Sequence, residues 1–295
     1  MARKKWITNA CLLAAFAGFS ALSVASDNYY PVELEARAGI DLQAYSEKTT
    51  ISSGSLATDY DALVPSAKTT IKLFFSPQTY MQFAGMGTLY SQANKETWKV
   101  NNQLVQENNL AATRTSFSLQ VGRRLAKLHD ISVGVGFDQN KFTRSKFDMT
   151  AYGETVFPKS DSTAYTDDDR TDLYNAVVKE ELLAVNLVGS YTLSNFFIDN
   201  SSGLRYKVSA QFSTPMYFRV TNINGGNYTT LTSQFDGFDL HTSAMLGWQF
   251  DRQWLLHAGI HTYYEKRNKI LSANAQLPNS ELFGAEAQVG FSTRF

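Results

Sequence analysis

The last fifteen residues of the chain, Glu281 to Phe295, read ELFGAEAQVGFSTRF. From Phe283 onward every second residue is apolar or a threonine, and the chain ends on Phe295. The residues between them are glycines or polar residues. Because side chains alternate between the two faces of a β-strand, this stretch predicts a strand with one apolar and one polar face.

The same stretch resembles the C-terminal strand of Gram-negative outer-membrane barrels, which carries a signal for assembly. That signal has a polar residue, a glycine two positions later and two spaced apolar positions ending in phenylalanine. Gln288, Gly290, Thr293 and Phe295 occupy these positions here, and Thr293 departs from the larger apolar residue that is usual. The resemblance implies transport by periplasmic chaperones and insertion by the barrel assembly machinery.

The N-terminus has the pattern of an export signal. Basic residues at 3–5 precede an apolar run at 10–21, and residues 23–25, Ser-Val-Ala, fit a cleavage site. The apolar run is shorter than the roughly 20 residues that a transmembrane helix needs. We therefore expect residues 1–25 to be a cleaved signal peptide and residues 26–295 to form a single barrel domain.

Composition excludes further classes of protein. Cys11 is the only cysteine, and the residues before it do not form a lipoprotein signal, so the mature chain would contain no disulfide and no cysteine-bound metal. Removing residues 1–25 takes away three of the 27 Lys and Arg and none of the 27 Asp and Glu, which leaves a net charge of −3. This charge does not favour nucleic acid as a partner.

The segment after the export signal repeats the pattern of the C-terminus. From Val32 to Tyr45, apolar residues alternate with glycines, polar residues and a terminal tyrosine. Strands of soluble sheets usually have about 5–6 residues, whereas a tilted strand needs roughly 9–11 residues to cross the hydrocarbon of a membrane. The length of this segment favours a membrane barrel.

Ten such segments predict an all-β fold, an antiparallel up-and-down transmembrane β-barrel of ten strands. The expected strands are residues 32–45, 68–75, 79–91, 113–124, 131–157, 183–191, 204–220, 238–250, 254–265 and 281–295. Short and long connections alternate, and the long ones include polar stretches at 46–67 and 92–112. This sorting is typical of outer-membrane barrels, with long loops at the cell surface and both termini in the periplasm. Twelve strands would replace ten if the long third loop hides another hairpin.

Aromatic residues make up 13% of the chain. Those at the ends of the expected strands would form girdles at the two membrane interfaces. These are Tyr45, Tyr80, Tyr90, Trp248, Trp254 and Tyr264.

The inward face of the predicted barrel carries charges of both signs. It includes Glu33, Glu35, Arg37, Asp41, Arg114, His257, His261, Glu286 and Arg294. Buried charges need partners, and barrel closure would bring Arg37 and Arg294 near the glutamates of the first and last strands. Water-filled channels appear in barrels of about 16 strands. We therefore expect a salt-bridged, plugged lumen, with a narrow porin-like channel as the alternative.

Three of the four histidines fall on two neighbouring predicted strands. A turn at residues 251–253 would pair position 241 with 262 or 263, so His241, His261 and Tyr263 would share the lumen side. Histidine titrates near neutral pH, so metal binding or acid–base chemistry is one interpretation; membership of the lumen hydrogen-bond network is the other, which we favour. The acidic loop at 167–169 lacks the spaced ligands of a calcium site, and we predict no metal and no cofactor.

The length and strand count resemble those of the omptins, ten-stranded outer-membrane proteases. Omptins use an Asp-x-Asp and an Asp-x-His motif from two surface loops to activate a water molecule. Asp239 and His241 match the second motif. Asp59 and Asp61 match the first, but lie in the first predicted loop, where the omptin pair belongs in the second. The resemblance implies these four residues as catalytic candidates.

A looser resemblance is to solitary autotransporter-type barrels, since residues 26–31 are too few to form a secreted passenger. Rigid scaffolds commonly present functional loops. We therefore favour a non-enzymatic structural or surface-interaction protein of the Gram-negative outer membrane, whose loops meet outer-membrane lipid, lipopolysaccharide or external ligands. A narrow channel and an omptin-like protease are the alternatives.

Overall fold

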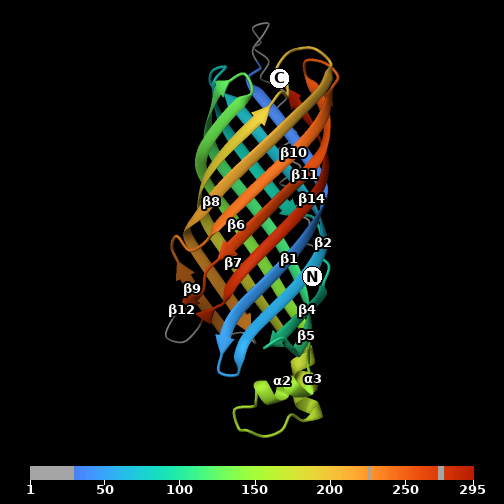
Figure 1. Cartoon of the computed structure of the whole chain (residues 1–295), viewed down its shortest axis with the longest axis vertical. Coiled ribbons are helices and arrows are strands. Elements are labelled where there is room, and N and C mark those ends of the chain that lie inside the picture. Colours follow the sequence, from blue (N-terminus) through green and yellow to red (C-terminus); the bar gives the residue numbers. More distant parts are fainter. Residues whose placement is uncertain (1–29, 225–226, 272–275) are drawn as a thin grey trace.

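The computed structural model describes residues 30–224, 227–271 and 276–295, which form a long barrel of tilted strands (Figure 1). The predicted signal peptide, residues 1–25, lies outside the described residues. The strands are β1 Val32–Ile51, β2 Gly54–Phe74, β3 Thr79–Thr88, β4 Asn94–Val100, β5 Gln103–Ala126, β6 His129–Met149, β7 Val177–Ser194, β8 Gly203–Asn224, β9 Asn227–Ser233, β10 Phe238–Gln249, β11 Trp254–Arg267, β12 Ile270–Leu271, β13 Gln276–Leu277 and β14 Asn279–Arg294. Two short helices, α2 Ala151–Val156 and α3 Asp167–Asn175, connect β6 to β7.

In the described part of the chain, the strands form a closed ring with ten positions. The order of hydrogen-bonded neighbours is β1, β14, β11, β10, β8, β7, β6, β5, β3 and β2, which pairs again with β1. β3 and β4 pair with different parts of β2 and β5, so they share one position in the ring. The antiparallel ten-stranded barrel is therefore confirmed. The twelve-stranded alternative is wrong, because the third long connection contains α2 and α3 instead of a hairpin.

The C-terminal strand closes the barrel against the first strand. Arg37 lies opposite Gly290 across the β1–β14 ladder, and Asp41 lies opposite Glu286. The apolar face of β14 points outward, as the 64% exposure of Val289 indicates. The polar face of the same strand therefore contributes to the lumen.

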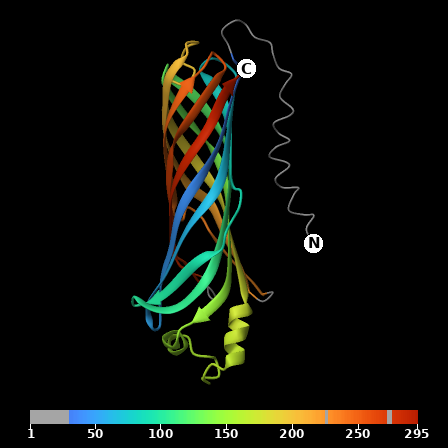
Figure 2. The ribbon, with the colours of Figure 1, turned by 90° about the vertical axis from the view of Figure 1, so that its right-hand side faces the viewer.

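The two ends of the barrel differ. The connections β2–β3, β5–β6, β7–β8 and β10–β11 lie together at the end that carries the C-terminus, which we call the turn end (Figure 1). The opposite end, the loop end, carries the β8–β9 hairpin, and α2 and α3 lie beyond it (Figures 1 and 2). None of the helices in the described residues has the length and apolar character to cross a membrane.

Several strands extend much further toward the loop end than the sequence predicts. β1 has 20 residues and β5 has 24. The predicted loops at 46–67 and 92–112 are wrong, because most of these residues belong to strands. The β4–β5 turn is made by Asn101 and Asn102, with φ of 51° and 68°. Two consecutive residues with positive φ are what a type I′ hairpin turn requires.

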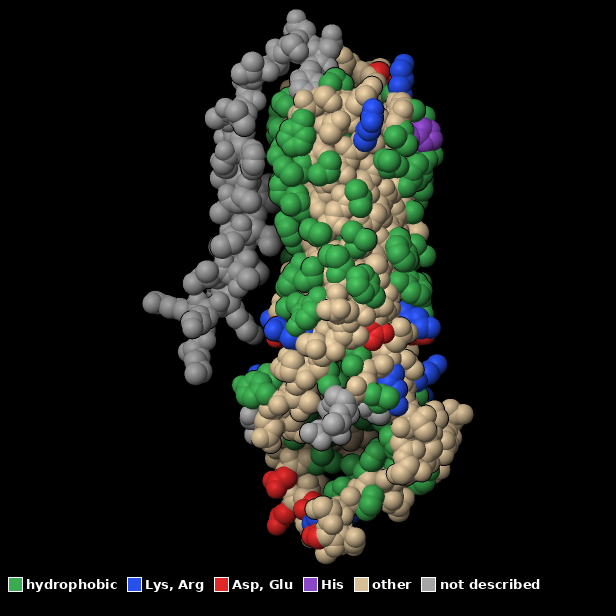
Figure 3. Space-filling model, turned by 90° about the vertical axis from the view of Figure 1, so that its left-hand side faces the viewer, with side chains coloured by type: hydrophobic (Ala, Val, Ile, Leu, Met, Phe, Trp, Pro, Cys, Tyr) green, Lys and Arg blue, Asp and Glu red, His purple; other side chains and the backbone are tan. Residues whose placement is uncertain are grey.

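The outer surface divides into two zones. On the face seen in Figure 3, apolar side chains cover the half near the turn end, and a belt of charged side chains separates it from the other half. The outward ion pairs Lys141–Glu181 and Lys266–Glu281, each 3.8 Å, stand where the apolar residues of their strands stop. An apolar outer band is the lipid-facing surface of membrane barrels. The turn-end half therefore has the character of the membrane-spanning part, and the loop-end half continues beyond it.

The side chains inside the barrel also differ between the two halves. Charged side chains fill the lumen of the turn-end half, while an apolar cluster occupies the interior toward the loop end. The cluster includes Val64, Leu110, Phe142, Leu182, Phe218, Val220 and Leu231. Because the outer surface of this second half meets water, its inward side chains can form an apolar core as they do in soluble proteins.

The predicted aromatic girdles are partly wrong. Tyr45 faces the interior at 5% exposure and stacks on Phe142 at 4.8 Å between ring centroids. Tyr80 is also buried, at 2% exposure. The exposed residues of the set are Tyr90, Trp248 and Trp254, while Tyr264 is half-buried.

Candidate functional site

An ion-pair bridge crosses the lumen in its turn-end half. The Glu35 carboxylate of β1 pairs with Arg37 at 2.9 Å and with Lys207 of β8 at 2.5 Å. β1 and β8 are separated in the ring by β14, β11 and β10, so this contact joins opposite walls. Arg37 also donates to Gln288 Oε1 on β14 at 3.3 Å. The charged residues thus hold one another across the lumen.

The opening of the lumen at the turn end is narrowed by the β7–β8 connection. A cavity of 190 Å³ remains there, lined in part by Glu33, Phe196 and Phe197. Arg294 donates to the Phe197 carbonyl at 2.9 Å and to Asn200 Oδ1 at 2.8 Å. Arg294 lies opposite Glu33 in the β1–β14 ladder, as barrel closure predicts, but its hydrogen bonds go to the β7–β8 connection. Its guanidinium reaches past the end of β14 and binds this connection.

A second layer of polar contacts lies deeper in the lumen. Tyr263 donates to Asp41 Oδ2 at 2.8 Å, and the Arg114 guanidinium lies 4.2 Å from the Tyr263 ring centroid. A Cβ at Gly284, on the neighbouring strand, would overlap the Tyr263 ring, so glycine makes room for this tyrosine. The ion pairs of this layer are Arg114–Glu265, Lys68–Glu286 and Arg267–Asp239.

Two of the lumen histidines lie together, as the hairpin register predicts. His241 pairs with Tyr263 in the β10–β11 ladder, and its Nδ1 is 3.5 Å from His261 Nε2. His257 lies nearer the turn end, against the ring of Phe196. In the described residues, no group of three or more His, Cys, Asp or Glu side chains is placed to hold a metal ion.

The four protease candidates do not form one site. Asp239 faces the lumen at 1% exposure, where it pairs with Arg267 at 2.5 Å and accepts a hydrogen bond from Ser213. His241 lies on the same face of β10. Asp59 and Asp61 point outward from β2 and are exposed, so the barrel wall separates them from His241. The structure therefore does not assemble the two motifs into a site for a water molecule.

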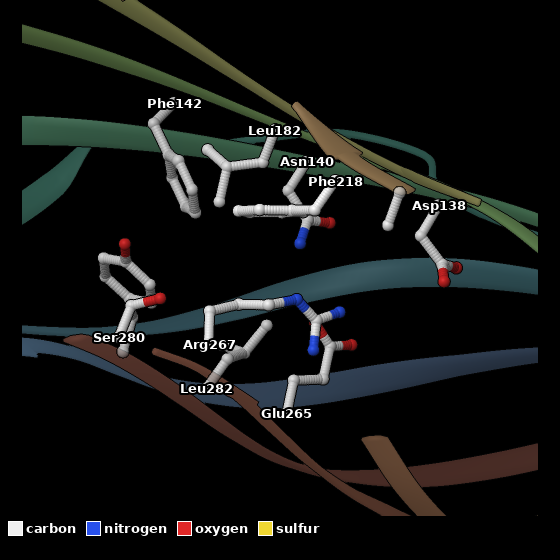
Figure 4. A pocket seen from close by; sticks show the side chains of 11 residues that line it. Asp138, Asn140, Phe142, Leu182, Phe218, Glu265, Arg267, Ser280 and Leu282 are labelled. Carbon is white, nitrogen blue, oxygen red and sulfur yellow. The ribbon is translucent and has the colours of Figure 1, made fainter. Parts of the chain in front are cut away.

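The lumen is nearly filled where its polar and apolar parts meet. Arg267 and Glu265 extend from one wall, and Phe142, Leu182 and Phe218 face them from the other (Figure 4). The cavity between them measures 20 Å³. A void of this size holds about one water molecule. The packing leaves no room for a solute at this level.

A charged cluster lies inside the loop-end half, beyond the outward ion pair of Lys141. Arg144 of β6 binds Glu96 through two nitrogens, with Nε–Oε2 and Nη2–Oε1 distances of 2.9 and 3.0 Å. It also approaches Glu47 at 3.1 Å and Glu180 at 3.6 Å. Burial and the negative charges of Glu47 and Glu96 raise the pKa of Glu180 to about 7, despite the opposing effect of Arg144. We call these four residues the Arg144 cluster.

Sequence reasoning missed the Arg144 cluster. Glu47 continues the inward, odd-numbered face of β1 that begins at Glu33. Glu96 lies in a stretch predicted as a loop. The alternation in β1 was the available signal, but the partners come from four different strands and are defined only by the closed ring.

The acidic residues at 167–169 have a local structural role. They form the first turn of α3, where Thr166 and Asp169 make a capping box. Asp169 also pairs with Lys159 at 2.9 Å. Negative charge at a helix N-terminus is stabilised by the helix dipole.

One solved structure of an outer-membrane barrel shares the fold of this chain. The outer membrane protease OmpT from Escherichia coli superposes with a TM-score of 0.62 at 10% sequence identity, covering 94% of this chain and 99% of OmpT. The translocator domain of the autotransporter NalP from Neisseria meningitidis is less similar, with a TM-score of 0.41 at 9% identity, covering 99% of this chain and 96% of that domain. No protein-family profile and no curated protein matches the sequence. A likeness at this identity concerns the fold and leaves the activity open.

Proposed function

We propose that this chain is an integral outer-membrane barrel with a closed lumen, whose loop end faces the cell exterior and acts as an interaction surface. The observation that carries the proposal is the filled lumen. The Glu35–Lys207 pair joins opposite walls, and the cavity at the junction with the apolar core measures 20 Å³. A barrel packed in this way gives solutes no path.

The loop-end half supports an outward-facing role. It has its own apolar core and a water-compatible outer surface, and it carries α2, α3 and the β8–β9 hairpin. Membrane barrels place their longer connections outside the cell and their short turns in the periplasm. We expect this half to stand above the membrane, next to lipopolysaccharide.

Export and assembly complete the proposal. Residues 1–25 would be cleaved on export, and periplasmic chaperones would carry the chain to the barrel assembly machinery. The C-terminal strand supports this route, because Gln288, Gly290, Thr293 and Phe295 keep the spacing of the assembly signal.

Cysteine labelling tests the orientation. Cys11 is the only cysteine, so a mature chain that begins after residue 25 carries none. Thr229→Cys places a thiol at an exposed position of the loop end, and Gln78→Cys places one in the β2–β3 turn. A membrane-impermeant maleimide should label Thr229→Cys on intact cells and Gln78→Cys only after the outer membrane is permeabilised. The reverse pattern, or equal labelling of both, would overturn the proposed orientation.

A further inference from the structure

The loop end of the barrel opens into a cavity of 400 Å³. Its wall comes from β1, β2, β4, β6, β7, β8 and β9 together with residues 277 and 278. Apolar side chains form most of the wall, among them Ile51, Leu56, Trp98, Phe147, Val220 and Leu231. Volumes of roughly 300–1,000 Å³ with mainly apolar walls and a few polar groups are typical of small-molecule sites.

The polar groups of this cavity belong to the Arg144 cluster. Glu47, Arg144 and Glu180 all line it. The cluster holds three carboxylates and one guanidinium, so negative groups exceed positive ones. Nε and Nη2 of Arg144 bind Glu96 and Glu47, and Nη1 approaches Glu180. An anionic ligand would therefore meet a cation that is already neutralised.

Glu180 is the member of the cluster that lacks a full set of partners. Its side chain is buried, with 8% exposure, and one oxygen, Oε2, is 3.6 Å from Arg144 Nη1. The other oxygen, Oε1, is buried and accepts no hydrogen bond of ordinary geometry from the described residues, although the nearby Asn222 side chain favours the ionised carboxylate and so lowers its pKa. A buried carboxylate oxygen without a donor is unfavourable, and an ammonium group supplies both the donor and the missing charge.

We infer that this cavity binds a small hydrophobic amine, with the ammonium at Glu180 and the apolar body against the wall. Trp98 and Phe147 also line the cavity, and aromatic rings attract a cation that lies within about 6 Å of the ring centroid. The Arg144 guanidinium already lies 5.9 Å from the Trp98 ring centroid. The inference rests on the proposed function in one respect: in a living cell, the loop end must face the external medium for such a ligand to reach the cavity.

Binding should depend on pH through Glu180. The groups that face it are Arg144 on β6, Glu47 on β1, Glu96 on β4 and Asn222 on β8. With the pKa of Glu180 raised to about 7, the carboxyl is largely neutral at pH 5.5 and largely ionised at pH 8. An alkyl amine stays protonated over this range, as lysine does. Affinity for the amine should therefore increase as pH rises through 7.

The direct test uses 4-phenylbutylamine as the probe, with 4-phenylbutanol and 4-phenylbutyrate as neutral and anionic analogues. The mature chain is placed in nanodiscs of zwitterionic phosphatidylcholine, and binding is measured by calorimetry against empty nanodiscs. A hydrogen bond between charged groups corresponds to about a tenfold or larger change in affinity. The amine should bind about tenfold or more tightly than either analogue at pH 8. Equal affinities for the three probes, or no binding of the amine above the empty-nanodisc background, would overturn the inference.

Two neighbouring glutamates provide a matched pair of variants. Glu180→Gln removes the inward charge, and Glu181→Gln removes the charge of the next residue, which faces outward near Lys141 at 3.8 Å. Glu180→Gln should bind the amine about tenfold more weakly than the wild type. Its affinity for the amine should also no longer increase between pH 5.5 and pH 8. Glu181→Gln should keep both. Equal behaviour of the two variants would contradict the assignment to Glu180.

A second variant covers the case in which Glu180→Gln fails to fold. Leu231→Asn places a polar group in the apolar wall at a β9 position outside the barrel ring, and it should weaken binding of the amine and the alcohol alike. Unchanged affinity for both probes would place their binding outside this cavity. These experiments use nanodiscs open on both faces, so they remain informative if the cysteine labelling overturns the orientation of the barrel.

Discussion

Replacing Arg144 by methionine should destabilise the loop-end half strongly. The substitution keeps a long side chain and removes the only cation of the Arg144 cluster. Three carboxylates would remain, with side-chain exposures of 10% for Glu47, 0% for Glu96 and 9% for Glu180. None of them could easily recover a partner from water.

The magnitude follows from burial. Removing one partner of a buried ion pair costs about 3–5 kcal/mol, because the remaining charge stays buried without compensation. Glu96 would lose three hydrogen bonds and Glu47 one, so we expect about 4 kcal/mol near pH 8. Arg144 lowers the pKa of Glu180, so its loss raises that pKa further and Glu180 takes up a proton as pH falls. The destabilisation should therefore shrink toward pH 5.

The assay is urea unfolding of the mature chain in phosphatidylcholine vesicles, followed by tryptophan fluorescence at pH 8 and pH 5. Arg144→Met/Glu96→Gln should recover about 1 kcal/mol or more, since it removes one unpaired buried carboxylate. Arg170→Met is the matched control. Arg170 pairs with Glu154 at 2.7 Å on the exposed surface of α3, and its loss should leave the unfolding midpoint unchanged. The reasoning fails if Arg144→Met and Arg170→Met have the same midpoint at pH 8.

Other substitutions test the lumen, the β4–β5 turn and assembly. Gly284→Ala should cost about 1–3 kcal/mol of unfolding free energy, because its methyl group meets the Tyr263 ring; a midpoint equal to wild type would show that Tyr263 moves freely. Asn102→Val should cost about 1–2 kcal/mol, because a β-branched residue resists positive φ, whereas Asn102→Gly should not destabilise; equal midpoints for the two variants would refute this turn. Phe295→Ala should reduce the folded barrel in isolated outer membranes while leaving refolding into vesicles unaffected, and normal outer-membrane levels would show that the terminal phenylalanine is dispensable.

The membrane-spanning part of the fold could be predicted because lipid imposes a regular pattern. In β1 and β14, apolar residues face outward and polar residues face the lumen, so period-two alternation located both strands and the seam between them. The pairing of His241 with Tyr263 was predictable for a similar reason, since a short turn sets the register of a hairpin. The alternation of residues along a strand and the position of a short turn were sufficient to predict these features.

The loop-end half was missed because its environment reverses the pattern. In β2, Tyr60 and Ala62 face inward while Asp59 and Asp61 face water. A stretch of this kind has a polar composition, which predicts a loop and makes Asp59 and Asp61 resemble a catalytic motif. The Arg144 cluster could not be predicted from the pattern of any single strand, because its members span residues 47 to 180 and meet only when the ring closes.

Single-channel recording of the refolded mature chain in a planar bilayer tests the closed lumen most directly. The Glu35–Lys207 bridge and the 20 Å³ junction predict no discrete current steps under voltages at which a sixteen-stranded porin, inserted as a control, conducts. Regular current steps from the wild-type barrel would contradict the closed lumen, and with it the account of this protein as a sealed scaffold for its loop end.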